Sequence, residues 1–264
     1  MIRIFFSIFF FSSCLILTAQ KWAVRVGFNN LKSYSKVEVT RLDDQRGDLE
    51  IKEGRPLADI MVGNRFYFFP QLSNFWDITV TYSIDSTHGL ITGFRAINPF
   101  ITSSITNEFG THTHGEGVTI PAVLLNYSYT VLQTKKENPS KLMLFGGVAI
   151  CFRPQGGSLG SGGWGSQTGA LDSSGNFYFE YTSAKVVRAY GPEYPLPYLN
   201  IGIDGALRLS KRWKVGMELA FYAGTKTLYT QEIEGKTNDA DFAYTLKLKP
   251  YFFSGGIYFQ YRIK

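Results

Sequence analysis

The chain has 264 residues, of which 44% are hydrophobic and 16% aromatic, and its formal net charge is +6. This small positive excess forms no basic cluster, so the sequence gives no support to nucleic-acid binding. Contact with anionic lipid headgroups is sufficient to account for it. The mean hydropathy is near zero, and beyond the N-terminal segment no run is long and apolar enough for a transmembrane helix.

The N-terminus predicts export. A single basic residue, Arg3, precedes an apolar stretch over residues 4–17, and the segment ends at Ala19. We therefore expect a signal peptide over residues 1–19, cleaved after Ala19, and one barrel domain over residues 20–264.

The sequence contains 2 cysteines, Cys14 and Cys151. Cys14 lies in the predicted signal and leaves open two other interpretations, a lipoprotein acylated at this cysteine and a retained anchoring helix. If the signal is cleaved after Ala19, Cys151 is the remaining cysteine, and no disulfide forms within the mature chain.

Beyond the signal, eight stretches alternate bulky apolar residues with small or polar ones. A period of two predicts β-strands that have one apolar and one polar face. In the stretch over residues 141–152 either set of side chains fits the apolar face. The eight stretches cover residues 22–29, 58–69, 76–84, 119–131, 141–152, 199–210, 213–222 and 253–263.

The composition of the two faces predicts which of them points outward. Eight strands enclose an interior just wide enough for side chains, and roughly forty bulky apolar residues do not fit there at protein packing density. The opposite face holds mostly Gly, Ala, Ser and Thr with single charges of both signs, which suits a narrow lumen. We therefore predict an all-β fold, an eight-stranded antiparallel transmembrane β-barrel whose apolar face, including Ile203 and Leu219, meets lipid.

The connections between these stretches alternate in length. Short ones fall at residues 70–75, 133–140 and 211–212, and long ones at residues 30–57, 85–117, 153–197 and 224–249. Outer-membrane barrels have short periplasmic turns and long extracellular loops, so we expect both termini in the periplasm.

The long connections are expected to carry structure of their own. The first and fourth each contain two alternating segments around a polar turn, which predicts hairpins above the membrane over residues 35–52 and 226–249. In the third, the Gly- and Ser-rich residues 156–169 around Trp164 are expected to be mobile, and strand character returns at residues 176–187.

Two of the predicted strands also resemble a known family. The run Ile120-Pro121-Ala122-Val123-Leu124-Leu125-Asn126-Tyr127 and the later Leu144-Phe145-Gly146-Gly147 are similar to the hallmark of the eight-stranded outer-membrane β-barrel domain proteins of Gram-negative bacteria. That family, also labelled porin-family or PorT-type, is related in architecture to the OmpA and OmpX barrels. The resemblance implies an outer-membrane barrel, and the PorT-type name implies a role in protein secretion.

Charged residues on the polar face are expected to pair and to fill the lumen, because mixed charges in a narrow, low-dielectric interior attract one another. An ion or proton path would use similar residues, but eight strands leave no continuous aqueous pore. The predicted lumen charges are Arg25, Arg65, Asp77, Asp204, Arg208, Lys214, Glu218 and Arg262.

All three histidines fall in the second long connection. In an extended segment His112, His114 and Glu116 share one face within reach of a single metal ion. His88 and Asp85 begin the same connection and could complete the ligand set. The spacing matches no established metal motif, so an ordinary polar loop is the alternative, and we predict no cofactor.

We expect a non-enzymatic function, because none of the predicted strands carries a histidine that could serve a lipid-facing catalytic site. Exposed aromatic residues commonly anchor interfaces, and several in the long connections are candidates for a surface binding or adhesion site on the extracellular loops. They could instead form a belt at the membrane interface or pack the loop hairpins together. The candidates are Tyr34, Trp164, Phe177, Tyr178, Tyr190, Tyr194 and Tyr229. The alternatives are an accessory subunit of a secretion or assembly complex, a small-solute channel and a lipid-modifying enzyme. The expected partners are outer-membrane lipids and a protein or other ligand at the loops.

Overall fold

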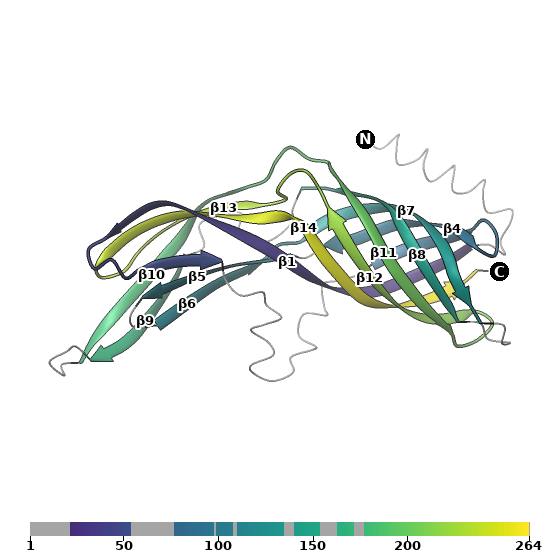
Figure 1. The fold of residues 1–264 in the computed structure, drawn as a ribbon, viewed down its shortest axis with the longest axis horizontal. Helices are drawn as coiled ribbons and strands as arrows, with labels where there is room; N and C mark the ends of the chain where they lie inside the picture. Colours follow the sequence, from purple (N-terminus) through teal and green to yellow (C-terminus); the bar gives the residue numbers. More distant parts are fainter. Residues whose placement is uncertain are drawn as a thin grey trace.

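The structure is a computed structural model that describes residues 22–53, 77–97, 99–107, 110–134, 140–153, 163–171 and 177–263. Among these residues no helix is long and apolar enough to cross a membrane. The molecule is elongated: a closed barrel forms one end, and a two-layered extension of strands continues it at the other (Figure 1).

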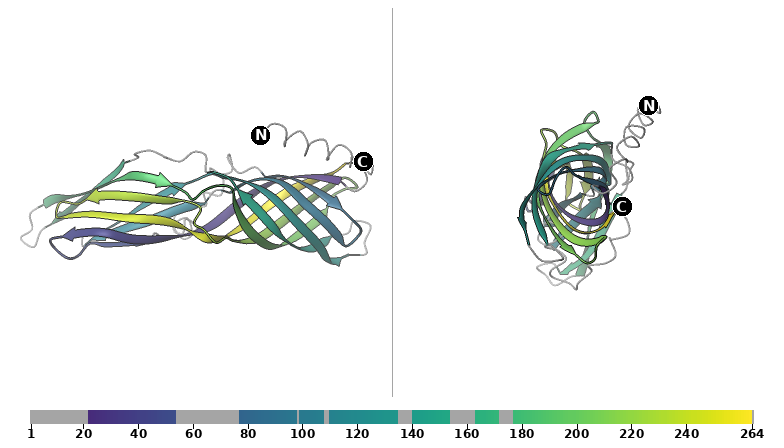
Figure 2. Two further views of the ribbon diagram at one scale, coloured as in Figure 1. Left: turned by 90° about the horizontal axis from the view of Figure 1, so that it is seen from above. Right: turned by 90° about the vertical axis from the view of Figure 1, so that its right-hand side faces the viewer.

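The barrel is a ring of eight antiparallel strands, which confirms the predicted all-β, eight-stranded architecture. Neighbours follow the order β1-β3-β4-β7-β8-β11-β12-β14, and the ring closes because β1 also pairs with β14. The view along the long axis shows the ring (Figure 2). Its strands are β1 (Trp22–Asp44), β3 (Asp77–Ser83), β4 (His88–Ile97), β7 (Ile120–Gln133), β8 (Lys141–Cys151), β11 (Leu196–Arg208), β12 (Trp213–Ala223) and β14 (Ala240–Arg262).

One strand of the ring is not the one predicted. The alternation at residues 58–69 predicts a strand there, and these residues lie outside the described part of the chain, as does the turn predicted at residues 70–75. The ring closes without them, because β4 pairs with both β3 and β7. The single long connection predicted over residues 85–117 is therefore wrong, since a short turn and β4 occupy its first part.

Three short turns lie together at one end of the barrel, which we call the turn end. Residues 84–87 form the turn between β3 and β4, where the Ile84 amide donates to the His88 carbonyl over 3.0 Å. The turn predicted at residues 211–212 connects β11 to β12. Residues 135–139 of the turn predicted at residues 133–140 lie outside the described part, but β7 and β8 pair on either side of it, and the Thr134 amide donates to the Ser140 carbonyl over 3.1 Å. Both ends of the described chain are also here, because the Ile263 amide donates to the Trp22 carbonyl over 3.0 Å.

The extension begins where the two longest strands continue beyond the barrel. β1 and β14 have 23 residues each and stay paired with each other beyond the barrel. On the far side of β14 the first layer continues with β13 (Thr230–Lys236), β10 (Phe177–Tyr190) and β9 (Gly163–Leu171). The second layer consists of β2 (Glu50–Glu53), β5 (Phe100–Asn107) and β6 (Gly110–Gly117).

These strands show which secondary structure the long connections form. Residues 226–249 form a hairpin as predicted, made by β13 and β14, and the strand predicted at residues 176–187 is part of β10. The hairpin predicted at residues 35–52 is wrong, because β1 stays paired with β14 and β2 pairs with β5. Part of the segment predicted to be mobile is β9, paired with β10 along its length, and residues 154–162 lie outside the described part.

An apolar core fills the extension between its layers. Ile101 of β5 and Tyr244 of β14 are 0% and 1% exposed. The hydroxyl groups of Ser103 and Tyr244 lie 2.8 Å apart and connect the two layers. The same core reaches into the barrel, where the rings of Tyr222 and Phe252 stack with centroids 4.7 Å apart. The extension is therefore a packed continuation of the barrel and shares its core.

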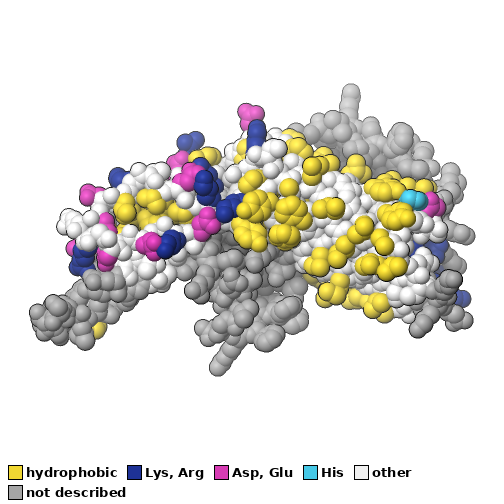
Figure 3. Space-filling view, in the orientation of Figure 1, with side chains coloured by type: hydrophobic (Ala, Val, Ile, Leu, Met, Phe, Trp, Pro, Cys, Tyr) yellow, Lys and Arg dark blue, Asp and Glu magenta, His cyan; other side chains and the backbone are white. Residues whose placement is uncertain are grey.

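The barrel wall carries its bulky apolar side chains on the outside. Leu125 and Leu199 are 61% and 69% exposed, whereas Asn200, the next residue on β11, is 5% exposed. In β8, where either set of side chains fitted the apolar face, Leu144 points outward and Phe145 points into the barrel. Apolar side chains spread over the barrel surface, and charged side chains gather on the extension (Figure 3).

Candidate functional site

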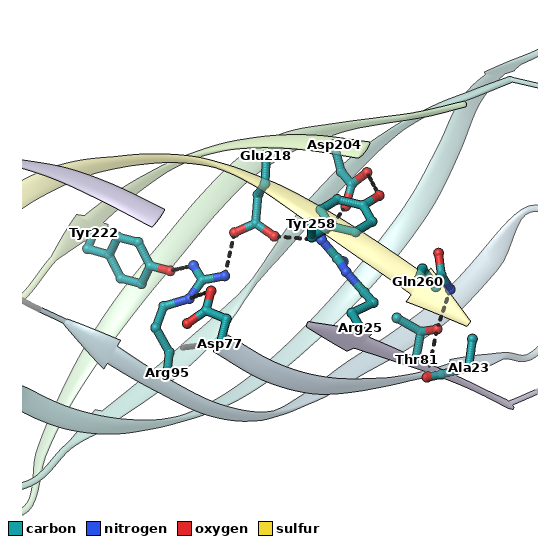
Figure 4. Close-up of polar contacts among 10 residues, drawn as sticks. All are labelled: Ala23, Arg25, Asp77, Thr81, Arg95, Asp204, Glu218, Tyr222, Tyr258 and Gln260. Carbon is teal, nitrogen blue, oxygen red and sulfur yellow. Dashed lines mark hydrogen bonds and ion pairs between the residues drawn. The ribbon is translucent and has the colours of Figure 1, made fainter. Parts of the chain in front are cut away.

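The barrel lumen holds a network of buried charged side chains (Figure 4). Arg95 places Nη2 2.8 Å from Glu218 Oε1 and Nε 2.7 Å from Asp77 Oδ2. Arg25 Nη2 lies 3.0 Å from Glu218 Oε2 and 2.9 Å from Asp204 Oδ2. The carboxylate of Glu218 thus joins two arginines into one network, and all five side chains are buried.

Two tyrosines supply further hydrogen bonds to the network. The Tyr258 hydroxyl donates to Asp204, and the Arg25 guanidinium lies 3.6 Å from the centre of the Tyr258 ring. Arg95 donates to the hydroxyl oxygen of Tyr222. Buried charges have a large free-energy cost unless they are paired and hydrogen-bonded. These contacts reduce the cost of burying the charged network inside the barrel.

Strand register explains why the arginines are needed. Asp77 and Arg95 are direct cross-strand partners on β3 and β4, a pair of opposite charges that stabilises the sheet. Asp204 and Glu218 are direct partners on β11 and β12, and two like charges in such positions are unfavourable. Arg25, on β1, binds both of these carboxylates and so compensates their repulsion.

Little space remains beside the network. A cavity of about 10 Å³ adjoins it, which is room for about one water molecule. The cavity is lined by Arg25, Gly27, Asp77, Thr79, Arg95, Glu218 and Tyr258. Side chains therefore fill the lumen at this level.

Four of the predicted lumen charges meet in this network, but Arg95 was not among those predicted. Arg95 lies in β4, within residues expected to form a loop. The signal that could have found it is the alternation of outward Leu90 and Phe94, which are 38% and 57% exposed, with inward Ile91 and Arg95, which are 4% and 5% exposed.

The remaining predicted lumen charges are not part of the network. Arg208, Lys214 and Arg262 occupy inward positions of β11, β12 and β14, but at the turn end. Arg65 lies outside the described residues. The described lumen charges therefore form a mixed-charge network in the centre and a group of cations at the turn end.

The predicted metal ligands are divided between the two ends of the molecule. His88 begins β4 at the turn end, where its Nδ1 hydrogen-bonds the Tyr127 hydroxyl. His112, His114 and Glu116 lie on β6 in the extension. The 10 residues of β4 span about 33 Å, so His88 cannot complete a site with the others. Among the described residues no group of three or more potential ligands is arranged to hold a metal ion.

The aromatic residues predicted for binding differ in exposure. Tyr229 is 1% exposed and Tyr194 packs half-buried against the core, so the expectation of an exposed binding side chain is wrong for Tyr229. Trp164 is part of β9, and Tyr178 and Tyr190 are part of β10. Tyr190 is 37% exposed, and the Arg188 guanidinium lies 4.9 Å from the centre of its ring. Burial raises the pKa of the Tyr190 hydroxyl, with a hydrogen bond to Glu232 contributing in the same direction.

A more pronounced aromatic feature lies on the outer face of β10. Phe177, Phe179 and Tyr181, which we call the aromatic row, alternate along the strand and are 63%, 51% and 56% exposed. The rings of Phe177 and Phe179 meet edge to face with centroids 5.1 Å apart. Asn238, in the turn between β13 and β14, donates to the Phe179 carbonyl over 2.9 Å and fixes the strand there. Of this row, only Phe177 was expected from the sequence to take part in binding.

The chain is similar to solved outer-membrane structures at low sequence identity. No family model matches the chain, and no curated protein matches it. Among solved structures it is similar to the outer membrane protein OprG from Pseudomonas aeruginosa, with 9% identity, a TM-score of 0.35, and coverage of 92% of this chain and 96% of that one. It is also similar to a deltaS2 mutant of the TodX monoaromatic hydrocarbon channel, with 7% identity, a TM-score of 0.19, and coverage of 93% and 91%.

Proposed function

We propose that the protein is an outer-membrane β-barrel with a filled lumen, and that it acts as a surface binding module through its extension. The observation that carries this proposal is the contrast between the two ends of one continuous fold. The barrel presents an apolar outer surface, whereas the extension is packed around its own core and presents charged side chains together with the aromatic row.

The outer surface of the barrel supports insertion in a membrane. Soluble monomers rarely expose apolar patches larger than a few hundred Å², but here outward leucines, isoleucines and aromatics surround most of the ring. Leu199, Ile201 and Ile203 follow one another at alternate positions of β11 and are 69%, 65% and 44% exposed. A closed ring satisfies all backbone hydrogen bonds between neighbouring strands, as the hydrocarbon region requires.

The extension supports the binding role. Its core orders the strands, so side chains on its surface are held in position before a partner arrives, which reduces the entropy lost on binding. The aromatic row offers three large side chains on one face, and aromatic residues are enriched among those that dominate binding energy at interfaces. We place the function here because the described residues that line the barrel lumen offer no comparable accessible surface.

Site-specific photo-crosslinking in cells tests this proposal. A photo-reactive amino acid at Phe179 should capture a partner, and substitution of Phe177 and Tyr181 by Ser should abolish that capture. Substitution of Val39 and Leu42 by Ser is the matched control, because both lie in the extension and are each 45% exposed. This control should leave capture unchanged.

The same experiment separates the proposal from an accessory-subunit role. A photo-reactive group at Lys211, in a turn at the other end of the molecule, reports on partners at the turn end. Capture of another envelope protein at Lys211, with none at Phe179, would contradict the surface-binding proposal and favour a subunit of a secretion or assembly complex.

A further inference from the structure

Two buried asparagines face the lumen on the side of the barrel where β7 and β8 lie. Asn126 is on β7 and Asn200 is on β11, one on either side of β8, and they are 3% and 5% exposed. The central network takes its charged side chains from β1, β3, β4, β11 and β12. The two asparagines therefore bring polar groups to a part of the wall where β7 and β8 contribute none to that network.

The side-chain amides of these asparagines have no hydrogen-bond partner among the described residues. Asn200 leaves both Nδ2 and Oδ1 unpaired, and Asn126 leaves Oδ1 unpaired. Burying an amide without a partner has a large free-energy cost, and buried polar groups in folded proteins are almost always hydrogen-bonded to protein or to ordered water. The three unpaired atoms therefore indicate a bound hydrogen-bonding molecule.

Strand register brings the two amides into one row. Asn126 and Asn200 are both direct cross-strand partners of Gly147 on β8. Neighbouring strands are about 4.8 Å apart, so the backbones of the two asparagines are roughly 10 Å apart. Gly147 has no side chain to place between them, and a Cβ there would lie 2.6 Å from Asn126 Oδ1. The Asn126 amide thus lies against Gly147, and the row contains no third side chain.

Apolar side chains surround this row. The inward neighbours of Gly147 along β8 are Phe145 and Ala149, which are 3% and 0% exposed. Ile91, the cross-strand partner of Asn126 on β4, is 4% exposed. These residues offer an amide no hydrogen bond and leave room only for a small molecule. A water that makes two hydrogen bonds of about 2.8 Å can join groups up to roughly 5.6 Å apart, which suits two side chains that extend inward from backbones on either side of β8.

We propose that Asn126, Gly147 and Asn200 form a binding site for one water molecule, which joins β7 to β11 across β8. Buried waters typically make about three hydrogen bonds to groups that would otherwise be unpaired. The water donates to Asn126 Oδ1, and it accepts from Asn200 Nδ2 or donates to Asn200 Oδ1. Gly147 is needed because any side chain there would displace the Asn126 amide.

The first test is a set of substitutions of similar size in the refolded full-length protein, unfolded by urea in lipid vesicles. Asn126→Leu and Asn200→Leu should each lower the unfolding midpoint, because the remaining asparagine and the water then lose a partner. The double variant should recover most of this loss, since replacing both partners by apolar groups of the same shape is nearly neutral. Single variants as stable as the unchanged protein, or losses that simply add, would overturn the proposal.

The matched control combines Asn126→Leu with Thr79→Val. Thr79 is also an inward residue, 4% exposed, but it lies on β3, two places from β7 in the ring. Because it has no share in the proposed water, the two changes in midpoint should add. Recovery of stability in this control as well would show a general benefit of an apolar lumen and would contradict the water site.

Direct detection of the water keeps the proposal testable if a variant folds poorly. In protein with isotope-labelled asparagine, NMR cross-relaxation between bound water and the side-chain amide hydrogens should be visible at both Asn126 and Asn200. The signal at Asn126 should disappear in the Asn200→Leu variant, because the water then loses its second partner. Absence of the signal at both residues, or a signal at Asn126 that persists in this variant, would refute the proposed bridge.

Discussion

Arg95 Nη2 and Glu218 Oε1 lie 2.8 Å apart across the full width of the lumen. Their strands, β4 and β12, are four places apart in a ring of eight, so the two residues come from opposite walls of the barrel. Glu218 also binds Arg25, and a single carboxylate therefore holds both guanidinium groups in the interior.

Substitution of Glu218 by Gln should be the most damaging single change in the network. It leaves Arg25 and Arg95 buried with one fewer counter-charge, and removing one partner of a buried ion pair costs about 3–5 kcal/mol. Asp77→Asn should cost less, because Arg95 keeps Glu218. Urea unfolding in lipid vesicles measures both. Met217→Leu, at the neighbouring outward position, is the control, and a Glu218→Gln variant as stable as this control would contradict the role given to the network.

The filled lumen predicts that the purified, refolded protein does not conduct ions. The charged network occupies the centre of the barrel, and the stacked Tyr222 and Phe252 rings lie farther from the turn end, toward the extension. Planar-bilayer recording should show no stable large conductance, whereas a porin added to the same membrane should show steps. Stable, large steps from this protein would make the filled-lumen proposal untenable.

The assignment of the lipid-facing surface can be tested at Ile203 and Leu219. They are direct cross-strand partners on the barrel wall and are 44% and 54% exposed. Arginine at either position should cost roughly 2–4 kcal/mol near the middle of a bilayer and impair insertion. Val39→Arg on the extension, facing water, should cost less than about 0.5 kcal/mol. Normal heat-modifiable migration of both barrel variants on gels would contradict this orientation.

Alternation of apolar with small or polar residues was enough to predict seven of the eight barrel strands. A strand with one apolar and one polar face shows this alternation within its own sequence. The prediction failed at β4 for a physical reason. Gly93 has a φ of +152°, and a Cβ there would lie 2.3 Å from the Ile78 carbonyl oxygen, so the site requires glycine. This inward glycine fits the small-residue face, but the bulky inward Ile91 and the polar, exposed Thr92 beside it interrupt the alternation that the other strands show.

The central network could be predicted only in part. Inward charges such as Asp204 and Glu218 can be recognised in the sequence, because each is a single charged residue among the small residues of the inward face. Which of them meet depends on how the strands are aligned, and alignment between distant segments is not encoded in either segment alone. The turn-end position of Lys214 and the pairing of β1 with β14 beyond the barrel depend on the same non-local information.

Glu38 predicts a pH effect in the extension. A hydrogen bond from Lys247 lowers the pKa of Glu38, and Lys36 acts in the same direction. Because the folded-state pKa is depressed, the stabilisation is present above the unfolded value of about 4.3 and is lost as the pH falls through the folded value. NMR titration of the Glu38 carboxyl should show this lowered pKa. Lys247→Gln should raise it more than Lys36→Gln, and the opposite order would contradict the ranking of the two contacts.

Deleting Gly163–Leu171 should loosen the extension without unfolding the barrel. The deletion removes β9, which pairs with β10 along its whole length, and β10 then keeps only its ladder with β13. The aromatic row lies on the part of β10 that pairs with β9 and not with β13, so its order should be lost first.

Hydrogen exchange and partner capture measure the result of this deletion. Amides of residues 177–182 should exchange faster, while those of β11 and β12, on the barrel wall, should keep their protection. Capture at Phe179 should fall together with the protection of β10. If β10 stays protected and capture is unchanged, β9 does not support the aromatic row; if β11 and β12 lose protection as well, the extension and the barrel unfold as one unit.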